Sequence, residues 1–88
     1  MIFITIFRWR KKPTKALVTD GGKLVDLMVK EGAKILGWYW TLGRYDGVLI
    51  TEGKDEKTMM KALMRFGDTF SMETLIAVPR EEAVKLVE

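Results

Sequence analysis

The sequence predicts an α+β fold, because segments with the composition of β-strands alternate with segments of helical periodicity. Four stretches are rich in β-branched and aromatic residues, and two amphipathic stretches separate the first from the second and the third from the fourth. A chain of 88 residues is long enough for one small domain, so residues 1–88 are expected to fold as a single unit.

The first strand and the first helix lie on either side of Pro13. Residues Ile2 to Trp9 are β-branched or aromatic at nearly every position, which is typical of a strand. From Asp20 onward apolar residues recur at helical spacing, and Gly32 supplies a stop signal, so a helix is expected between these two positions. Residues 14–19 predict either an irregular segment or a short helical lead-in.

The middle of the chain predicts a hairpin of two strands. The second strand is expected over Lys34 to Leu42, with an aromatic triplet at residues 38–40, and the third over Asp46 to Glu52. Only residues 43–45 separate them, a length that suits a short loop containing glycine.

The last third of the chain predicts a helix, a strand and a short helix. Asp55 is a good N-cap for a second amphipathic helix, whose apolar stripe ends at Gly67. Thr69 to Val78 predicts a fourth strand, and Arg80 to Glu88, which follow Pro79, predict a short C-terminal helix. The element order is therefore βαββαβ with a terminal helix, which is the ferredoxin-like arrangement.

The predicted sheet carries large apolar residues on both faces. In the first strand one face holds Ile2, Ile4 and Ile6 and the other holds Phe3, Phe7 and Trp9. In the second strand Trp38, Trp40 and Leu42 are expected to oppose Ile35 and Tyr39. Both long helices cover one face of such a sheet, and the chain has no further element large enough to cover the other. A second copy is expected to cover it, giving a homo-oligomeric, dimeric α+β barrel that pairs through the open sheet face.

A few polar residues interrupt these apolar strands. Thr5, Thr51 and Glu73 are expected to be isolated polar points in an apolar interior, as in a pocket for a small molecule. The alternative interpretation is that they are ordinary interface residues. They are candidate ligand-binding residues on the first interpretation only.

Four further candidate ligand residues lie in and after the second strand. Trp38 and Trp40 share a face and could clamp a flat apolar ligand, or could pack in an interface core. Tyr45 and Asp46 could form a pocket edge at which the phenol donates a proton and the carboxylate accepts one. Alternatively, the carboxylate accepts a backbone N–H across the turn while the ring packs over the sheet end. No residue is assigned a catalytic role.

The composition excludes several kinds of chemistry. The chain has no cysteine and no histidine, which excludes disulfides, thiolate chemistry, haem ligation by histidine and the usual zinc sites. No acidic cluster has the spacing of a metal site, so neither a metal nor a cofactor is expected. No stretch approaches the roughly 20 apolar residues that span a bilayer, and no export signal is recognised, so we expect a cytoplasmic protein without membrane contact. The lack of Asn and Gln suggests a thermophilic source.

A basic run follows the first strand. Five cations fall within eight residues that contain no acid: Arg8, Arg10, Lys11, Lys12 and Lys15. Together with Trp9 they could bind nucleic acid, and the βαββαβ order is also that of the RNA recognition motif. The third strand, however, lacks the aromatic residues that this motif stacks on bases, and Asp46 and Glu52 would repel phosphate. The basic run is therefore expected to be a solvated loop, and nucleic acid is not favoured as a partner.

Two short motifs carry a resemblance to a known family. The T-L-G-x-Y-D pattern is present as Thr41, Leu42, Gly43, Tyr45 and Asp46, and "METLIAV" in the last strand looks like a T-E-T-L segment. On these residues the chain resembles the GYD-domain family of the dimeric α+β barrel superfamily. The resemblance covers nearly the whole domain and fits least well at residues 11–22. It implies the fold and the assembly more firmly than an activity.

The function that we expect is the binding of a small apolar or aromatic molecule, between the sheet and its helices or at the subunit interface. The superfamily that the chain resembles also includes cofactor-independent monooxygenases and isomerases. An enzyme of that kind needs a dry pocket and one base, for which Tyr45, Asp46 and Glu73 are the candidates. The third alternative is nucleic-acid binding through the basic first loop. Whether the chain is an enzyme stays open at this point.

Overall fold

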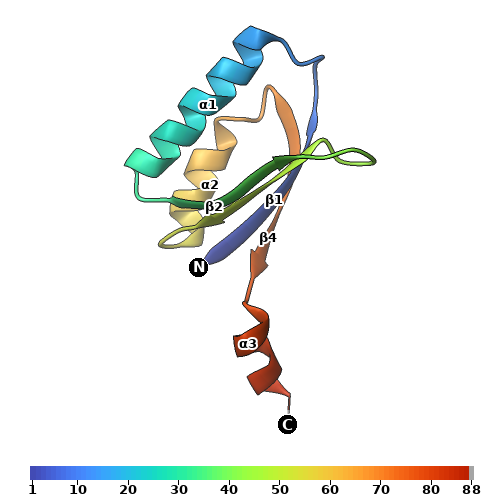
Figure 1. Ribbon diagram of the computed structural model, residues 1–88. Helices are drawn as coiled ribbons and strands as arrows, with labels where there is room; N and C mark the ends of the chain where they lie inside the picture. Colours follow the sequence, from blue (N-terminus) through green and yellow to red (C-terminus); the bar gives the residue numbers. More distant parts are fainter. Residues whose placement is uncertain (88) are drawn as a thin grey trace.

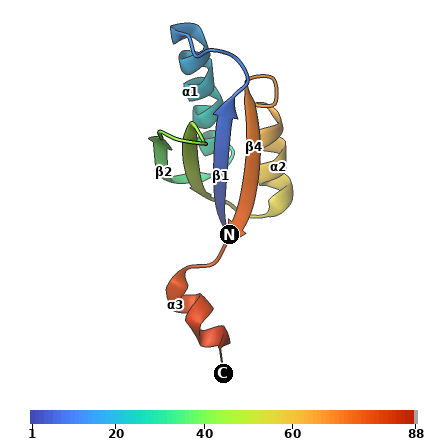
Figure 2. The ribbon, with the colours of Figure 1, turned by 90° about the vertical axis from the view of Figure 1, so that its right-hand side faces the viewer.

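The computed structural model describes residues 1–87 and has two layers, a four-stranded sheet with two helices on one of its faces (Figures 1 and 2). The elements are β1 (Ile2–Trp9), α1 (Lys15–Lys30), β2 (Lys34–Trp40), β3 (Gly47–Glu52), α2 (Glu56–Met64), β4 (Phe70–Ala77), α3 (Arg80–Ala83) and the 3-10 turn η1 (Val84–Leu86). The strand order is β2-β3-β1-β4, and all neighbouring strands are antiparallel. The predicted α+β class is confirmed.

Helix α1 begins at Lys15, so of the two expectations for residues 14–19 the helical lead-in is the correct one. Thr14 caps it, because the threonine Oγ1 accepts a hydrogen bond from the Leu17 N–H at 3.2 Å and so satisfies an amide that has no partner within the helix. The Gly21–Gly22 pair, whose low helix propensity makes the start of this helix hard to place from the sequence, lies inside the helix. The end agrees with prediction, since Gly32 follows the helix with a φ of 110°.

The loop between β2 and β3 is longer than the three residues predicted. The second strand ends at Trp40, before Leu42, and the third begins after Asp46. Within the loop the Thr41 N–H donates to the Asp46 carbonyl at 2.9 Å, and the Thr41 hydroxyl donates to the Tyr45 carbonyl at 2.7 Å. Leu42 is therefore not part of the sheet, and its side chain is fully exposed.

Strand β2 contains a bulge that changes which side chains share a face. Ile35 pairs with Thr51 and Gly37 pairs with Ile50, so Leu36 is an extra residue without a partner. The extra residue reverses the alternation, and Ile35 consequently lies on the same face as Trp38. The prediction that Ile35 opposes the two tryptophans is therefore wrong, whereas Tyr39 does lie on the opposite face.

The core lies between the sheet and the two helices. On this face β1 contributes the buried side chains of Phe3, Thr5 and Phe7, and the helices contribute residues that include Met28 and Leu63. The opposite face is also apolar, as predicted. It carries Ile2, Ile4, Ile6, Tyr39, Val48, Ile50 and Leu75. No element within residues 1–87 covers this open face (Figure 2).

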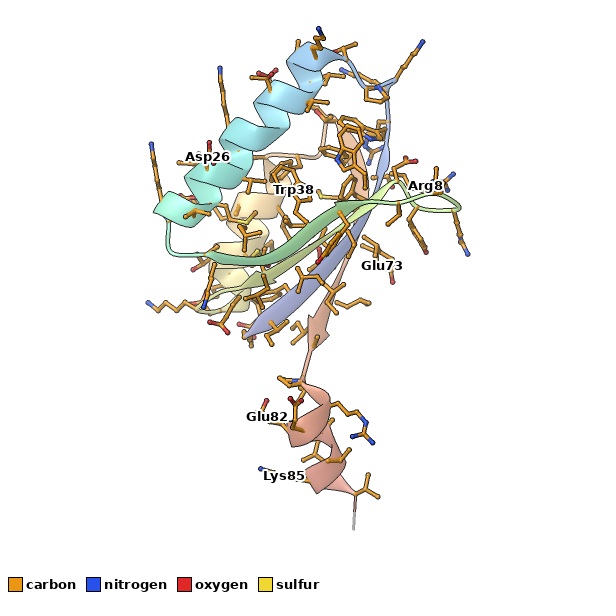
Figure 3. All side chains as sticks on the ribbon, viewed as in Figure 1. Arg8, Asp26, Trp38, Glu73, Glu82 and Lys85 are labelled. Atoms are coloured by element: carbon orange, nitrogen blue, oxygen red, sulfur yellow. The ribbon has the colours of Figure 1, made fainter. Side chains whose placement is uncertain are left out.

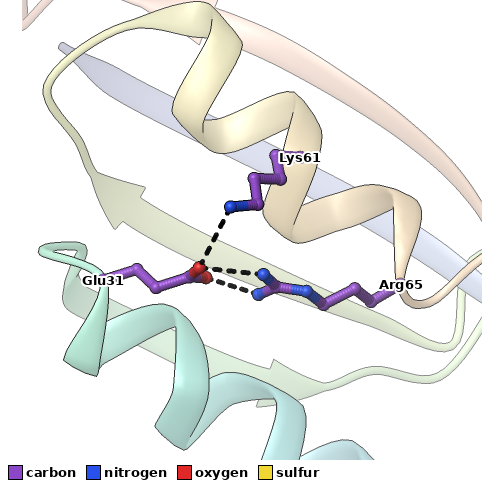
Figure 4. A network of polar contacts seen from close by, with 3 residues as sticks. All are labelled: Glu31, Lys61 and Arg65. Carbon is purple, nitrogen blue, oxygen red and sulfur yellow. Dashed lines mark hydrogen bonds and ion pairs between the residues drawn. The ribbon is translucent and has the colours of Figure 1, made fainter.

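The two helices are joined at their C-terminal ends by an ion pair (Figure 4). Arg65 meets the carboxylate of Glu31 with both terminal nitrogens, Nη2 lying 2.8 Å from Oε2, and Lys61 Nζ lies 3.8 Å from the same oxygen. Hydrogen bonding to Arg65 holds the pKa of the Glu31 carboxyl below its usual range.

The C-terminal segment projects beyond the end of the sheet (Figures 1 and 2). The predicted helix of residues 80–88 is shorter in the structure, because α3 gives way to the tighter turn η1 at Val84; Glu88 lies outside the described residues. Val84, Leu86 and Val87 are exposed on this segment. The described residues extend 49 Å along the longest axis and 17 Å along the shortest.

Candidate functional site

The three tryptophans of the chain gather at one end of the helix-covered face of the sheet. The rings of Trp9 and Trp40 are nearly perpendicular with centroids 5.8 Å apart, and Trp9 also lies 4.5 Å from Phe70. Trp40 and Phe7 both pair with Gly47, one from each side of β3. Since this glycine has no side chain, the ring of Phe7 can occupy the space above the start of β3.

A cavity of about 180 Å³ separates this aromatic cluster from α1. Its floor is formed by Phe7, Trp9, Trp38, Trp40 and Phe70, and its roof is formed by Leu17, Val18 and Gly21 of the helix. The side chain of Trp38 points into the space between sheet and helix (Figure 3). The walls are thus almost entirely apolar and largely aromatic.

Gly21 is the residue that keeps this cavity open. It is buried, yet a Cβ atom added to it would meet no atom within 4 Å. The space that a side chain would fill is therefore vacant. A smaller cavity of about 30 Å³ continues from the same glycine toward Thr5, Leu49 and Leu63.

Thr5 supplies the polar group at this inner end. Its side chain is 2% exposed, and its hydroxyl lies 3.0 Å from the hydroxyl of Thr74. The two hydroxyls satisfy each other, so the burial of Thr5 leaves no polar atom without a partner.

A second, polar hollow of about 490 Å³ adjoins the aromatic cluster on the side of the first loop. Trp9 and Trp40 line it together with Arg10, Lys11 and Asp46, and Lys12 also belongs to it. The Asp46 Oδ2 atom accepts the Trp9 backbone N–H at 2.8 Å, so this carboxylate joins the loop to β1. The expectation that it would accept an N–H across its own turn is therefore wrong.

Four of the seven expected ligand residues lie around these hollows: Thr5, Trp38, Trp40 and Asp46. The other three lie elsewhere. Tyr45 is stacked against Arg44, whose Cζ is 5.5 Å from the ring centroid. Thr51 is fully buried near α2, where its hydroxyl donates to the Met59 sulfur at 3.7 Å. Glu73 lies exposed on the open face of the sheet (Figure 3).

The site also contains residues that were not expected to belong to it, namely Trp9, Arg10, Gly21 and Phe70. A helix read from the cap Thr14 would have placed Leu17, Gly21 and Val25 on one face at intervals of four residues, with a gap at the glycine. No local signal identifies Phe70, which reaches the site because it pairs with Trp9 across β1 and β4.

The remaining surface offers fewer features of a binding site. A wider apolar groove of about 500 Å³ runs between α2 and β4, and the exposed Met60 and Met64 form part of its lining. Within residues 1–87 no group of three or more acidic residues is arranged to hold a metal ion. No helix of the described chain is long and apolar enough to cross a membrane.

Comparison with known proteins identifies a family for this chain. A family model described as the GYD domain matches residues 3–87, which is nearly the whole chain. No curated protein matches the sequence.

Proposed function

The chain belongs to the GYD-domain family, and from this premise we propose that it binds a small apolar or aromatic molecule in the cavity between α1 and the sheet. The observation that carries this proposal is the meeting of three tryptophans around a space that Gly21 leaves vacant. Ligand pockets are mostly apolar and aromatic with few polar groups, and this cavity has that composition.

The size of the cavity suits one aromatic ring. An apolar cavity of about 150 Å³ in a protein core is large enough to hold benzene, and this one measures about 180 Å³. Glycine inside a helix is also less favourable than alanine by about 1 kcal/mol. Nothing crowds the Cβ position of Gly21, so packing does not require the glycine there. Gly21 therefore leaves room in the cavity at a cost in helix stability.

We propose further that the subunit is ferredoxin-like and assembles face to face as a dimeric α+β barrel. The element order and the strand order β2-β3-β1-β4 support the first part. The uncovered apolar face supports the second, because a monomer would leave Ile4, Ile50 and Leu75 in contact with water. Pairing of two such faces is symmetric and uses the same surface on both copies.

Binding is favoured over catalysis by the positions of the candidate bases. Tyr45 and Glu73 lie away from the cavity, and Asp46 reaches only the adjoining hollow, where it is hydrogen-bonded to the backbone of Trp9. A base that acts on a molecule in the cavity would have to lie within hydrogen-bonding distance of it.

Native mass spectrometry of the freshly purified protein tests both parts of the proposal, because it reports the number of subunits and any retained small molecule together. We expect an oligomer that carries extra mass. Gly21→Leu should remove the extra mass, because the new side chain enters the cavity, and Gly22→Leu is the matched control on the same helix. Retention of the molecule by Gly21→Leu would place it elsewhere, and a bare monomer would contradict the assembly.

A further inference from the structure

The basic run that follows β1 lies at the mouth of the aromatic cavity. Arg10, Lys11 and Lys12 line the polar hollow, and Trp9 and Trp40 line it as well. The same two tryptophans line the apolar cavity. A molecule that rests against these rings therefore has an apolar space on one side and a group of cations on the other.

These cations are not neutralised by the protein. No ion pair within residues 1–87 involves Arg10, Lys11 or Lys12. The Nε atom of Arg10 donates to the Phe70 carbonyl at 3.0 Å, which anchors the side chain and leaves its two terminal nitrogens for another partner. Asp46 is the acid that lines this hollow, so three cations and one carboxylate leave an excess of positive charge.

We propose that the molecule bound at this site is an aromatic anion, with its ring in the cavity and its acidic group in the basic hollow. This inference rests on the proposed function, because it assigns a chemical class to the ligand of the same cavity. An acidic group would be held by charge-assisted hydrogen bonds, which are about twice as strong as neutral ones. The tryptophans would select a flat ring, and the cations would select its charge.

Benzoate and benzamide form a suitable pair of probes, since they have the same shape and differ in charge. The three tryptophans of the chain all lie at the site, so their indole N–H signals in a ¹H–¹⁵N spectrum report its occupancy. We expect both probes to shift these signals and benzoate to bind about tenfold more tightly, as is typical of a hydrogen bond to a charged group. Added salt should weaken the binding of benzoate and leave the binding of benzamide unaffected.

The matched variants remove two charges near the site or far from it. Lys11→Gln/Lys12→Gln should reduce the preference for benzoate over benzamide, because it removes two of the three cations of the hollow and leaves the cavity and the anchored Arg10 intact. Lys54→Gln/Lys57→Gln removes the same amount of charge at the opposite end of the sheet. It should change the affinity for neither probe. The dispersion of the spectrum shows that each variant is folded.

The outcomes separate this inference from the proposed function. Equal binding of benzoate and benzamide would keep the aromatic pocket and overturn the anionic ligand. Binding of neither probe would contradict both. If inorganic phosphate alone, or a single-stranded oligonucleotide, bound through Lys11 and Lys12 more tightly than benzoate, the basic hollow would serve a different partner and the inference would be wrong.

Discussion

The ring of Phe7 occupies the space in which Gly47 would carry a side chain. A Cβ atom on this glycine would lie 2.7 Å from Cε2 of the phenylalanine, closer still to Cζ, and 2.7 Å from the Tyr39 carbonyl oxygen. The glycine is therefore required for the packing of Phe7 against the start of β3, at the end of the sheet where the aromatic cluster lies.

Replacement of this glycine should consequently destabilise the fold. We expect Gly47→Ala to lower the free energy of unfolding by about 1–3 kcal/mol, the usual range for an overpacked core, as measured by urea titration. Gly53→Ala is the control, because its nearest neighbour, the terminal methyl of Met59 at 3.0 Å, can move aside. Equal losses in the two variants would show that the close approach of Phe7 is not the cause.

Filling the cavity from the helix should have the opposite effect on stability. Gly21→Ala is expected to raise the free energy of unfolding by about 0.5–1 kcal/mol through helix propensity, since nothing obstructs the new methyl group. Gly22→Ala should stabilise to a similar degree. The two should differ in ligand retention, which native mass spectrometry measures, because only the first glycine lines the cavity. A loss of stability in Gly21→Ala would contradict the vacancy of the cavity beside Gly21, because it would mean that the new methyl group meets other atoms.

The ion pair between Glu31 and Arg65 predicts a dependence of stability on pH. Since the native pKa of this carboxyl lies below its usual range, the pair stabilises the fold above the pKa of the unfolded chain. That contribution is lost as the pH falls through the lower native pKa. Arg65→Met should therefore be less stable than the wild type at neutral pH, and the two should converge in acid. A difference that persists at all pH values would point to packing instead of charge.

A charge on the open face should disrupt the assembly. Ile4 lies on this face between Ile50 and Leu75, so Ile4→Lys would bury a lysine between two sheets in the proposed dimer. We expect a folded monomer, measured by light scattering coupled to size exclusion. Val29→Lys, at an exposed position of α1, should leave the oligomer unchanged. An unaltered mass for Ile4→Lys would exclude this face as the interface.

The link between Asp46 and Trp9 should also contribute to stability. Asp46→Ala leaves the partly buried Trp9 N–H without its acceptor, for which a loss of about 1–3 kcal/mol is expected. Asp46→Asn keeps an oxygen at this position and should lose less. Thermal unfolding of the two variants measures the difference, and equal losses would indicate that the charge, not the hydrogen bond, is what matters.

Much of the fold could be predicted, because its signals are local. Asp55 caps α2 as expected, because its carboxylate accepts the Thr58 N–H at 2.8 Å. Gly32 follows the end of α1 with a positive φ, also as expected. The face assignment of Ile35 was wrong because the bulge at Leu36 reverses the alternation and depends on pairing with β3. Thr14 was available as a cap signal, but Gly21 and Gly22 lower helix propensity and concealed it.

The candidate site was only partly predictable for a different reason. Trp38 and Trp40 stand out in the sequence, whereas the cavity also requires that Trp9 and Phe70 pair across β1 and β4. That pairing joins residues 61 positions apart, and no periodicity within one segment contains it. Glu73 illustrates the same limit. The alternation along β4 shows which residues share a face with Glu73, but it does not show which face the helices cover.

The projecting C-terminal segment makes the chain convenient to attach to a surface. Ala77, at the end of β4, pairs with Ile2, while the aromatic cavity lies around Trp9 at the other end of β1, about 24 Å away at roughly 3.4 Å per residue. A tether placed after Val87 would therefore hold the molecule by a segment that projects beyond the sheet, at the end away from the aromatic cavity (Figure 1). In an immobilised format, the three indoles would serve as a built-in optical reporter at the far end.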